Sequence, residues 1–225
     1  EADRVGEVTL NIAEEHFFPW SPDSPFLYDL TVGTTQGPEE DFDTVHSYFA
    51  LRKWSCVPDA HGVLRFCLND QPILLNGLLD QGYWPKGLYT PPSDAAVERE
   101  LSEVKALGFN LLRKHAKIEP QRWYYHCDKL GLIVWQDMVN GGGPYKLWFV
   151  TYLTNVFQPL LRRLPDARPL WGLLGRETEA GREEYARELE VTVKALQCHP
   201  CVGCWVPFNE GWGQFDAAGA VEAVR

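Results

Sequence analysis

Polar and aromatic side chains that could do chemistry close four apolar runs in the second part of the chain. They are, run by run, Asp80, Gln81 and Trp84; Arg113 and His115; Gln136 and Asp137; and Asn209, Glu210 and Trp212. Carboxylates and amides bind hydroxyl groups, and an indole ring offers a flat apolar surface to the face of a sugar ring. If the four runs bring their ends together, this set is typical of a carbohydrate-binding site.

The alternation of strands and helices from about residue 73 onward predicts how these residues are positioned. Predicted strands lie at 73–79, 109–113, 132–136 and 201–206, and predicted helices lie at 93–107, 121–130 and 182–196. Parallel strands with helical crossovers form either an open doubly wound sheet or a closed barrel, and the periodicity leaves both open. In a (β/α)8 barrel the active site is built at the carboxyl ends of the strands, where these polar residues stand.

The ends of the first two helices are marked by residues that start and stop helices. Ser93 and Pro120 stand at the predicted starts, and Gly108 and Gly131 stand at the predicted ends. The apolar stripe that the first helix should bury is Val97, Leu101, Val104 and Leu107.

A long segment interrupts the alternation between Asp137 and about Gly181. It opens on the glycine run NGGGP and contains a predicted helix around 145–164. We interpret this segment as a loop insertion.

The first part of the chain has a period of two, which predicts strands rather than helices. Alternating apolar residues occur at 8–12 and 28–32, the segment 43–54 is a further strand candidate, and the turn-like segments SPDSP and TTQGPEED separate them. This pattern is typical of a β-sandwich. The change of pattern places a domain boundary between about Trp54 and Ile73, and we set the two domains at 1–58 and 59–225.

Composition restricts the class of partner. The chain has 225 residues, 45% of them hydrophobic, and a formal net charge of -10, so it has no basic surface for nucleic acid or for an anionic membrane. We expect a neutral partner. The only methionine is Met138, and the last ten residues begin like a helix that has no stop signal. We therefore expect the chain to be a piece of a longer protein.

The cysteine spacing raises a metal site as an alternative. Cys198, Cys201 and Cys204 recur every third residue beside His199. Structural zinc needs four converging ligands, and an odd separation sends Cys201 and Cys204 to opposite faces of the predicted strand. We favour free thiols that serve as small apolar side chains, with no metal.

Four segments in the part with alternating strands and helices resemble glycoside hydrolase family 2, which includes β-galactosidases, β-glucuronidases and β-mannosidases. They are NGLLDQGYWP, GFNLLRKHAKIEP, LGLIVWQD and WVPFNEGWGQFD. SPDSPFLYDL and DTVHSYFALRKW similarly resemble the immunoglobulin-like domain that precedes the barrel in that family. The resemblance implies the C-terminal part of an immunoglobulin-like β-sandwich followed by strands one to four of a (β/α)8 barrel.

The resemblance also implies hydrolysis of β-glycosidic bonds with retention of configuration and without a cofactor. Glu210 matches the acid/base glutamate and Asn209 the asparagine that contacts the sugar 2-hydroxyl, while the nucleophile would lie after a seventh strand, beyond this chain. A general acid needs a pKa raised towards neutrality, and we expect partial burial among Trp205, Phe208 and Trp212 to raise it.

The other matching residues have two interpretations each. Arg113 and His115 point the same way on a strand and would lie near the sugar, but only Lys114 separates them where many family members have two residues. Arg113 could instead form a structural bridge to Asp137. Asp80 and Asp137 either contact sugar hydroxyls or orient their neighbours, and Trp84 and Trp212 are either sugar platforms or core.

A rival function is a non-catalytic carbohydrate-binding or scaffold protein that kept this fold and lost the chemistry.

Overall fold

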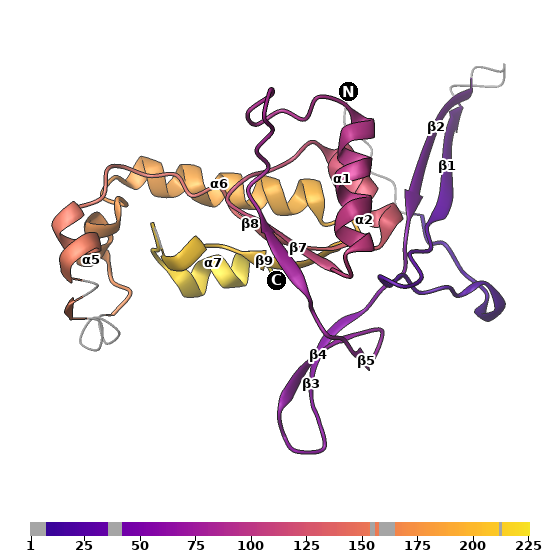
Figure 1. Ribbon diagram of the computed structural model, residues 1–225, viewed down its shortest axis with the longest axis horizontal. Coiled ribbons are helices and arrows are strands. Elements are labelled where there is room, and N and C mark those ends of the chain that lie inside the picture. The colour runs from indigo at the N-terminus through magenta and orange to yellow at the C-terminus, as the bar shows by residue number, and fades with distance from the viewer. Residues whose placement is uncertain (1–7, 36–41, 154–155, 158–164, 212) are drawn as a thin grey trace.

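A computed structural model describes residues 8–35, 42–153, 156–157, 165–211 and 213–225. Strands in these residues form a two-stranded antiparallel sheet, a three-stranded antiparallel sheet and a four-stranded parallel sheet. Figure 1 shows the parallel sheet in the middle of the molecule, with the two antiparallel hairpins standing away from it in different directions.

The parallel sheet consists of β6 (Gly77–Asp80), β7 (Leu111–Lys114), β8 (Ile133–Asp137) and β9 (Val202–Val206). Its order is β6-β7-β8-β9, and each strand is joined to the next by a helix: α1 (Asp94–Ala106), α2 (Gln121–Leu130) or α6 (Glu179–Leu196). The spatial order follows the chain without the reversal that defines a doubly wound sheet. All four carboxyl ends therefore lie along one edge.

The first parallel strand is shorter than the predicted segment 73–79. Residues 71–72 form β5 (Gln71–Pro72), which pairs with β4 (Leu64–Leu68) instead. The side chain of Asn110 forms hydrogen bonds with the backbone of the residues that follow. Its Oδ1 accepts from Asn76 N (2.8 Å) and its Nδ2 donates to Leu74 O (2.7 Å). Parallel pairing begins only at Gly77 for this reason.

Capping residues set the helix ends where the sequence predicts them. The Ser93 hydroxyl accepts from Ala96 N (3.2 Å) at the start of α1, and Gly131 takes a left-handed φ of 72° directly after α2. The α1 stripe is buried at Val97 and Leu101, but Leu107 is 73% exposed because it follows the last helical residue. The stripe prediction was wrong at that position.

The main core lies between the parallel sheet and helices α1, α2 and α6. Its buried members include Leu112, Val134, Trp123, Tyr124 and Leu196, and Trp20 from the N-terminal part joins them. A second cluster around Met138, Tyr185, Leu189 and Phe215 lies beside the carboxyl end of β8. This second cluster is the one that contacts the candidate site.

The N-terminal part contains β1 (Tyr28–Thr35) paired antiparallel with β2 (Phe42–Phe49). The strand predicted at 8–12 is absent from the described residues, where the first regular element is η1 (Glu14–His16). Isolated strands are unstable in water, and no neighbour is described that this segment could pair with. No described strand before Trp54 enters the parallel sheet.

The hairpin of β3 (Trp54–Pro58) and β4 follows directly. A boundary after residue 58 falls in the turn of this hairpin and would separate two paired strands. The Trp54 ring lies so close to the backbone of β9 that a Cβ added at Gly203 would come within 2.7 Å of it. The ring of Phe66 lies 6.3 Å from that of Trp135 on β8. The hairpin therefore packs on the sheet face that carries Trp135, over β8 and β9.

The N-terminal part is tied to the end of α2 and to the amino end of β9. Trp20 Nε1 donates to Asp128 O (2.8 Å), and the Tyr48 hydroxyl donates to Asp128 Oδ2 (2.7 Å), which also lies 2.7 Å from His199 Nδ1. Arg52 donates to two carbonyl oxygens at the start of β9 (2.7 and 2.8 Å). Asp128 and His199 are both buried, so this junction is a packed polar interface.

The predicted insertion contains short helical turns. They are η2 (Trp148–Leu153), which is a π-helix, α5 (Arg168–Trp171) and η3 (Gly172–Leu174). Of the helix predicted at 145–164, residues 154–155 and 158–164 lie outside the described residues. After β9 the chain forms η4 (Asn209–Gly211) and α7 (Ala217–Ala223). In the described parts of the chain, no helix is long and apolar enough to cross a membrane.

Candidate active site

Three side chains from neighbouring strand ends are joined in one hydrogen-bonded group. Arg113 donates through Nε to Asp137 Oδ1 (2.9 Å) and through Nη2 to Asp137 Oδ2 (3.1 Å), and Nη2 also reaches Asn209 Oδ1 (2.7 Å). The Asp137 side chain is fully buried and that of Arg113 is 30% exposed. A fork-shaped guanidinium that meets a carboxylate with two parallel bonds is a strong and geometrically specific pair. Arg113 therefore bridges to Asp137, and it fixes Asn209 as well.

Glu210 lies directly beside this group. The hydrogen bond to Asp137 raises the pKa of Arg113, against the effect of burial, and the charges of Asp137 and Glu210 add to the rise. The Glu210 carboxylate is thus within electrostatic reach of the guanidinium. Its backbone is left-handed, with a φ of 53°, a conformation that is uncommon outside glycine and often found at functional turns.

The partial burial expected for Glu210 is not found, because its side chain is exposed. Phe208 turns away from it and stacks on Tyr185 at 5.2 Å, and Trp205 packs against the two core clusters. The third expected neighbour, Trp212, lies outside the described residues.

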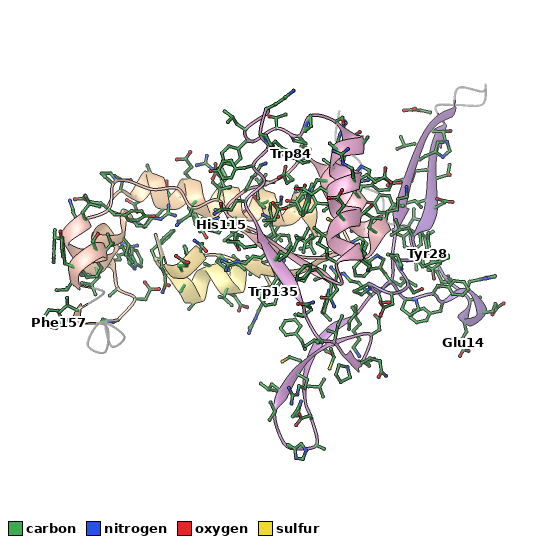
Figure 2. The ribbon with its side chains drawn as sticks, in the orientation of Figure 1. Glu14, Tyr28, Trp84, His115, Trp135 and Phe157 are labelled. Atoms are coloured by element: carbon green, nitrogen blue, oxygen red, sulfur yellow. The ribbon has the colours of Figure 1, made fainter. Side chains whose placement is uncertain are left out.

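His115 and Gln81 come together from the ends of β7 and β6. Gln81 Nε2 lies 3.4 Å from His115 Nδ1, and the backbone N–H of His115 donates to Asp80 O (2.8 Å). His115 is partly buried. Figure 2 shows His115 and Trp84 in the central body, away from Tyr28 on the N-terminal part. Trp84 packs against the main core, which supports its interpretation as a core residue.

Asp80 belongs to a buried group of charges beneath the strand ends. Lys114 Nζ lies 2.6 Å from Asp80 Oδ2 and 3.0 Å from Glu119 Oε1, and it stands 4.1 Å from the centre of the Trp123 ring. Lys117 Nζ contacts the same Glu119 oxygen at 2.8 Å. Two cations and two anions thus balance. The other Asp80 oxygen accepts from Gly82 N (2.7 Å), so the geometry supports the alternative that Asp80 orients its neighbours.

The same group explains a glycine in the loop after β6. Gly82 has a φ of 69°, and a Cβ there would lie 2.5 Å from Glu119 Oε1 and 2.6 Å from Lys117 Nζ. Any other residue would be strained and would push into the ion pair.

A chain of hydrogen bonds connects this charge group to Asp137. The Tyr124 hydroxyl donates to Gln136 Oε1 (2.6 Å), and Gln136 Nε2 donates to Lys117 O (2.8 Å) and to Asp137 O (2.7 Å). Lys114, Lys117 and Glu119 are not among the residues predicted from the sequence, although their partner Asp80 is. The available signal was Lys114 itself, a charged residue that alternates with Arg113 and must point into the helix layer.

Cys201 and Cys204 lie on opposite sides of the sheet. Cys201, directly before β9, has its Sγ 3.7 Å from Tyr124 O on the helix side. Cys204 is paired in register with Trp135, and Trp135 with Arg113, so the Cys204 thiol lies on the face that carries Arg113. All six cysteines are free thiols, and the described His, Cys, Asp and Glu side chains form no cluster that could hold a metal ion.

Comparisons with known proteins show which proteins the chain resembles. The chain is 29% identical over 153 residues to a β-galactosidase of Leuconostoc mesenteroides and 24% identical over 229 residues to β-mannosidase B of Aspergillus flavus. These alignments cover 67% and 97% of the chain but 14% and 23% of the relatives, so the chain spans less than a quarter of either. No protein-family model matches the chain. The relatives are glycosidases by name.

The fold agrees with this class. The structure of a β-D-glucuronidase from Dictyoglomus thermophilum matches 92% of the chain and 32% of its own length with a TM-score of 0.69 at 15% sequence identity. The predicted resemblance is confirmed: the chain is a glycoside hydrolase family 2-like segment that covers only part of each relative.

Proposed function

We propose that this chain carries the acid/base half of the active site of a retaining β-glycosidase. In this proposal β6 to β9 are the first four strands of a (β/α)8 barrel, and the N-terminal part is the end of an immunoglobulin-like sandwich. The observation that carries the proposal is the Arg113–Asp137–Asn209 group, which stands beside Glu210 at the carboxyl ends of three adjacent strands.

Glu210 would serve twice in the reaction. It would protonate the glycosidic oxygen as the bond to the leaving group breaks, and it would then deprotonate the water that releases the sugar from the enzyme. The sugar would be captured in between by a second carboxylate, which we place outside this chain.

Asn209 is prepared to donate a hydrogen bond. Its Oδ1 accepts from Arg113 Nη2 (2.7 Å), so the amide is held with Nδ2 as its remaining polar group. A donor fixed in this way suits a sugar hydroxyl, because its orientation is set before the substrate arrives. Asp137 supports Asn209 indirectly by fixing Arg113, and His115 would contact the sugar from the neighbouring strand end.

The exposure of Glu210 is consistent with a site to which this chain contributes only part of the surrounding residues. The relatives are at least four times longer than the part that aligns. Strands contributed by the rest of such a protein would cover the open side of Glu210 and desolvate its carboxylate.

The acid/base role is tested by the leaving-group dependence of Glu210→Gln in the complete natural protein that contains this chain. Alkyl β-glycosides need protonation and should lose about 10²- to 10⁴-fold in kcat/KM, while activated aryl β-glycosides should lose much less in the glycosylation step. Azide should restore turnover of the aryl substrates by replacing the water that is no longer activated. Aryl β-galactosides are the first substrates to assay, given the β-galactosidase relative.

Glu222→Gln is the matched control, because Glu222 is an exposed glutamate of α7. Equal losses on both substrate classes for Glu210→Gln would contradict the role. Sugar binding without any turnover by the unmodified protein would instead support the rival non-catalytic function.

A further inference from the structure

The loop that carries Glu210 has an irregular backbone. Between β9 and α7, Glu210, Gly211, Gly213 and Asp216 all have positive φ, from 41° to 76°. Besides the η4 turn itself, Gln214 N donates to Gly211 O at 3.2 Å. Contacts with other elements therefore also help to determine where Glu210 lies.

Before Glu210 the loop is held by α6. The Tyr185 hydroxyl donates to Pro207 O, and the Tyr185 ring stacks on Phe208 at 5.2 Å with an interplanar angle of 12°. Tyr185 is buried in the second core cluster. The approach of the chain to Glu210 is thus fixed by a rigid helix.

After Glu210 the loop is held by Arg176, which belongs to the insertion. Arg176 is 2% exposed. Its Nε donates to Gly213 O (2.8 Å), and its Nη2 donates to Asn140 Oδ1 (3.3 Å). Its guanidinium lies 4.6 Å from the Tyr185 ring centre and 5.1 Å from that of Phe215. The charge is therefore enclosed between two aromatic faces and directed at the loop carbonyl.

The contact with Arg176 requires a glycine at position 213. A Cβ at Gly213 would lie 2.6 Å from Asn140 Oδ1 and 3.2 Å from Arg176 Nε. The loop can approach the guanidinium only because this residue has no side chain.

A second residue of the insertion holds the end of the same loop with the opposite charge. Asp166 Oδ1 accepts from Asp216 N (3.1 Å) and Asp166 Oδ2 accepts from Ala217 N (2.6 Å) at the start of α7. The Asp166 carboxylate also accepts from Trp171 Nε1 (2.6 Å), which fixes it to α5. One insertion thus offers a cation to a loop carbonyl and an anion to two loop N–H groups.

We propose that residues 165–178 form a clamp that sets the position of Glu210, with Arg176 as its positioning residue. The proposal rests on the acid/base role of Glu210. In the described part of the chain Arg176 has no carboxylate partner, and burying such a cation is costly. Its contacts with Gly213 O and with the Tyr185 and Phe215 rings offset this cost and determine where the loop lies. Displacement of a catalytic group by about 1 Å can lower a rate by about 10²-fold.

The clamp is tested first without any activity measurement, by amide hydrogen exchange in the complete natural protein. Arg176→Met should speed exchange of the amides of residues 208–216 by about 10- to 100-fold, since a charge-assisted hydrogen bond is lost. Arg176→Lys should show a smaller increase. Arg187→Met, on the exposed surface of α6, is the matched control and should leave the loop unchanged. Amides of β7 and β8 report whether each variant remains folded.

The second readout separates positioning from folding. Arg176→Met should lower kcat for alkyl β-glycosides by about 10- to 100-fold with little change in KM, and the loss on activated aryl β-glycosides should be smaller. Unchanged loop exchange would overturn the clamp. A loosened loop with full activity would overturn the positioning role.

A third variant keeps the test decisive if Arg176→Met does not fold. Asp166 is exposed, so Asp166→Ala should fold and should loosen residues 214–217. Exchange there that matches the unmodified protein would then overturn the clamp. If the loop loosens and Glu210→Gln leaves every substrate unaffected, the acid/base proposal fails while the clamp stands.

Discussion

At the scale of single residues, Lys114 shows how a strand of the parallel sheet uses both of its faces. Arg113 is directed to Asp137 and Asn209, while Lys114 points into the helix layer and neutralises Asp80 and Glu119. A lone buried charge is far more costly than a balanced pair. The two neighbours therefore have different roles. Arg113 orients Asp137 and Asn209 in the candidate site, and Lys114 lowers the free-energy cost of burying Asp80 and Glu119 beneath it.

We predict that Lys114→Met lowers the free energy of unfolding by about 3–5 kcal/mol, because it leaves Asp80 without a cation and leaves Glu119 with Lys117 alone. Urea denaturation measures the change. Arg122→Met is the control: Arg122 and Asp94 form a pair whose side chains are 65% and 55% exposed, and its loss should cost about 0–1 kcal/mol. Adding Asp80→Asn to Lys114→Met should recover part of the stability, because it removes the carboxylate that has lost its cation. Similar losses for Lys114→Met and Arg122→Met would contradict this account.

The sequence was a good guide to which residues meet and a poor guide to their surroundings. The bridge from Arg113 to Asp137 was one of two interpretations and is present. The prediction that Glu210 is partly buried was wrong, since the exposure of its side chain depends on the residues that face it across the open side of the sheet. The contact between Arg176 and Gly213 could not be predicted, because the two residues are 37 positions apart and no periodicity of the sequence links an insertion to a distant loop.

At the scale of elements, signals that act within one turn of chain were reliable. Ser93, Gly108, Pro120 and Gly131 mark helix ends through local backbone geometry, and the structure has those ends there. Strand ends depend on partners, which explains the late start of β6 and the missing strand at 8–12. The hairpin of β3 and β4 was missed as a unit for the same reason: its strands are joined across the expected domain boundary.

We predict that Ser93→Ala lowers the free energy of unfolding by about 1 kcal/mol through the loss of the α1 cap. Thermal or urea denaturation checks the value. Ser102→Ala, in the middle of the same helix, should have no cost or a slight stabilising effect, since alanine has the higher helix propensity. A Ser93→Ala variant as stable as Ser102→Ala would show that the cap contributes nothing.

At the scale of the whole molecule, β6 and β9 each have one strand neighbour within the described residues, so the parallel sheet is open at both sides. A retaining glycosidase needs two carboxylates roughly 5 Å apart. Asp80 is bound to Lys114 and the fully buried Asp137 to Arg113, so we expect neither to lie where a nucleophile opposite Glu210 would be needed.

We predict that the 225-residue chain alone does not turn over activated aryl β-galactosides, β-glucuronides or β-mannosides. The measurement is release of the aryl group by purified chain, with Glu210→Ala as the control for contaminating enzymes. Turnover that Glu210→Ala abolishes would contradict the prediction and would require a nucleophile among these residues.

The attachment of the N-terminal part has a mechanical consequence. Trp20 and Tyr48 bind Asp128 near the end of α2, and Arg52 binds carbonyl oxygens at the start of β9, whereas Asn209 and Glu210 follow the carboxyl end of β9. A strand of five residues is about 17 Å long, so the two ends are separated by the full height of the sheet. A displacement of the hairpin of β1 and β2 would therefore act first on Asp128 and His199, at the opposite end of the sheet from the candidate site.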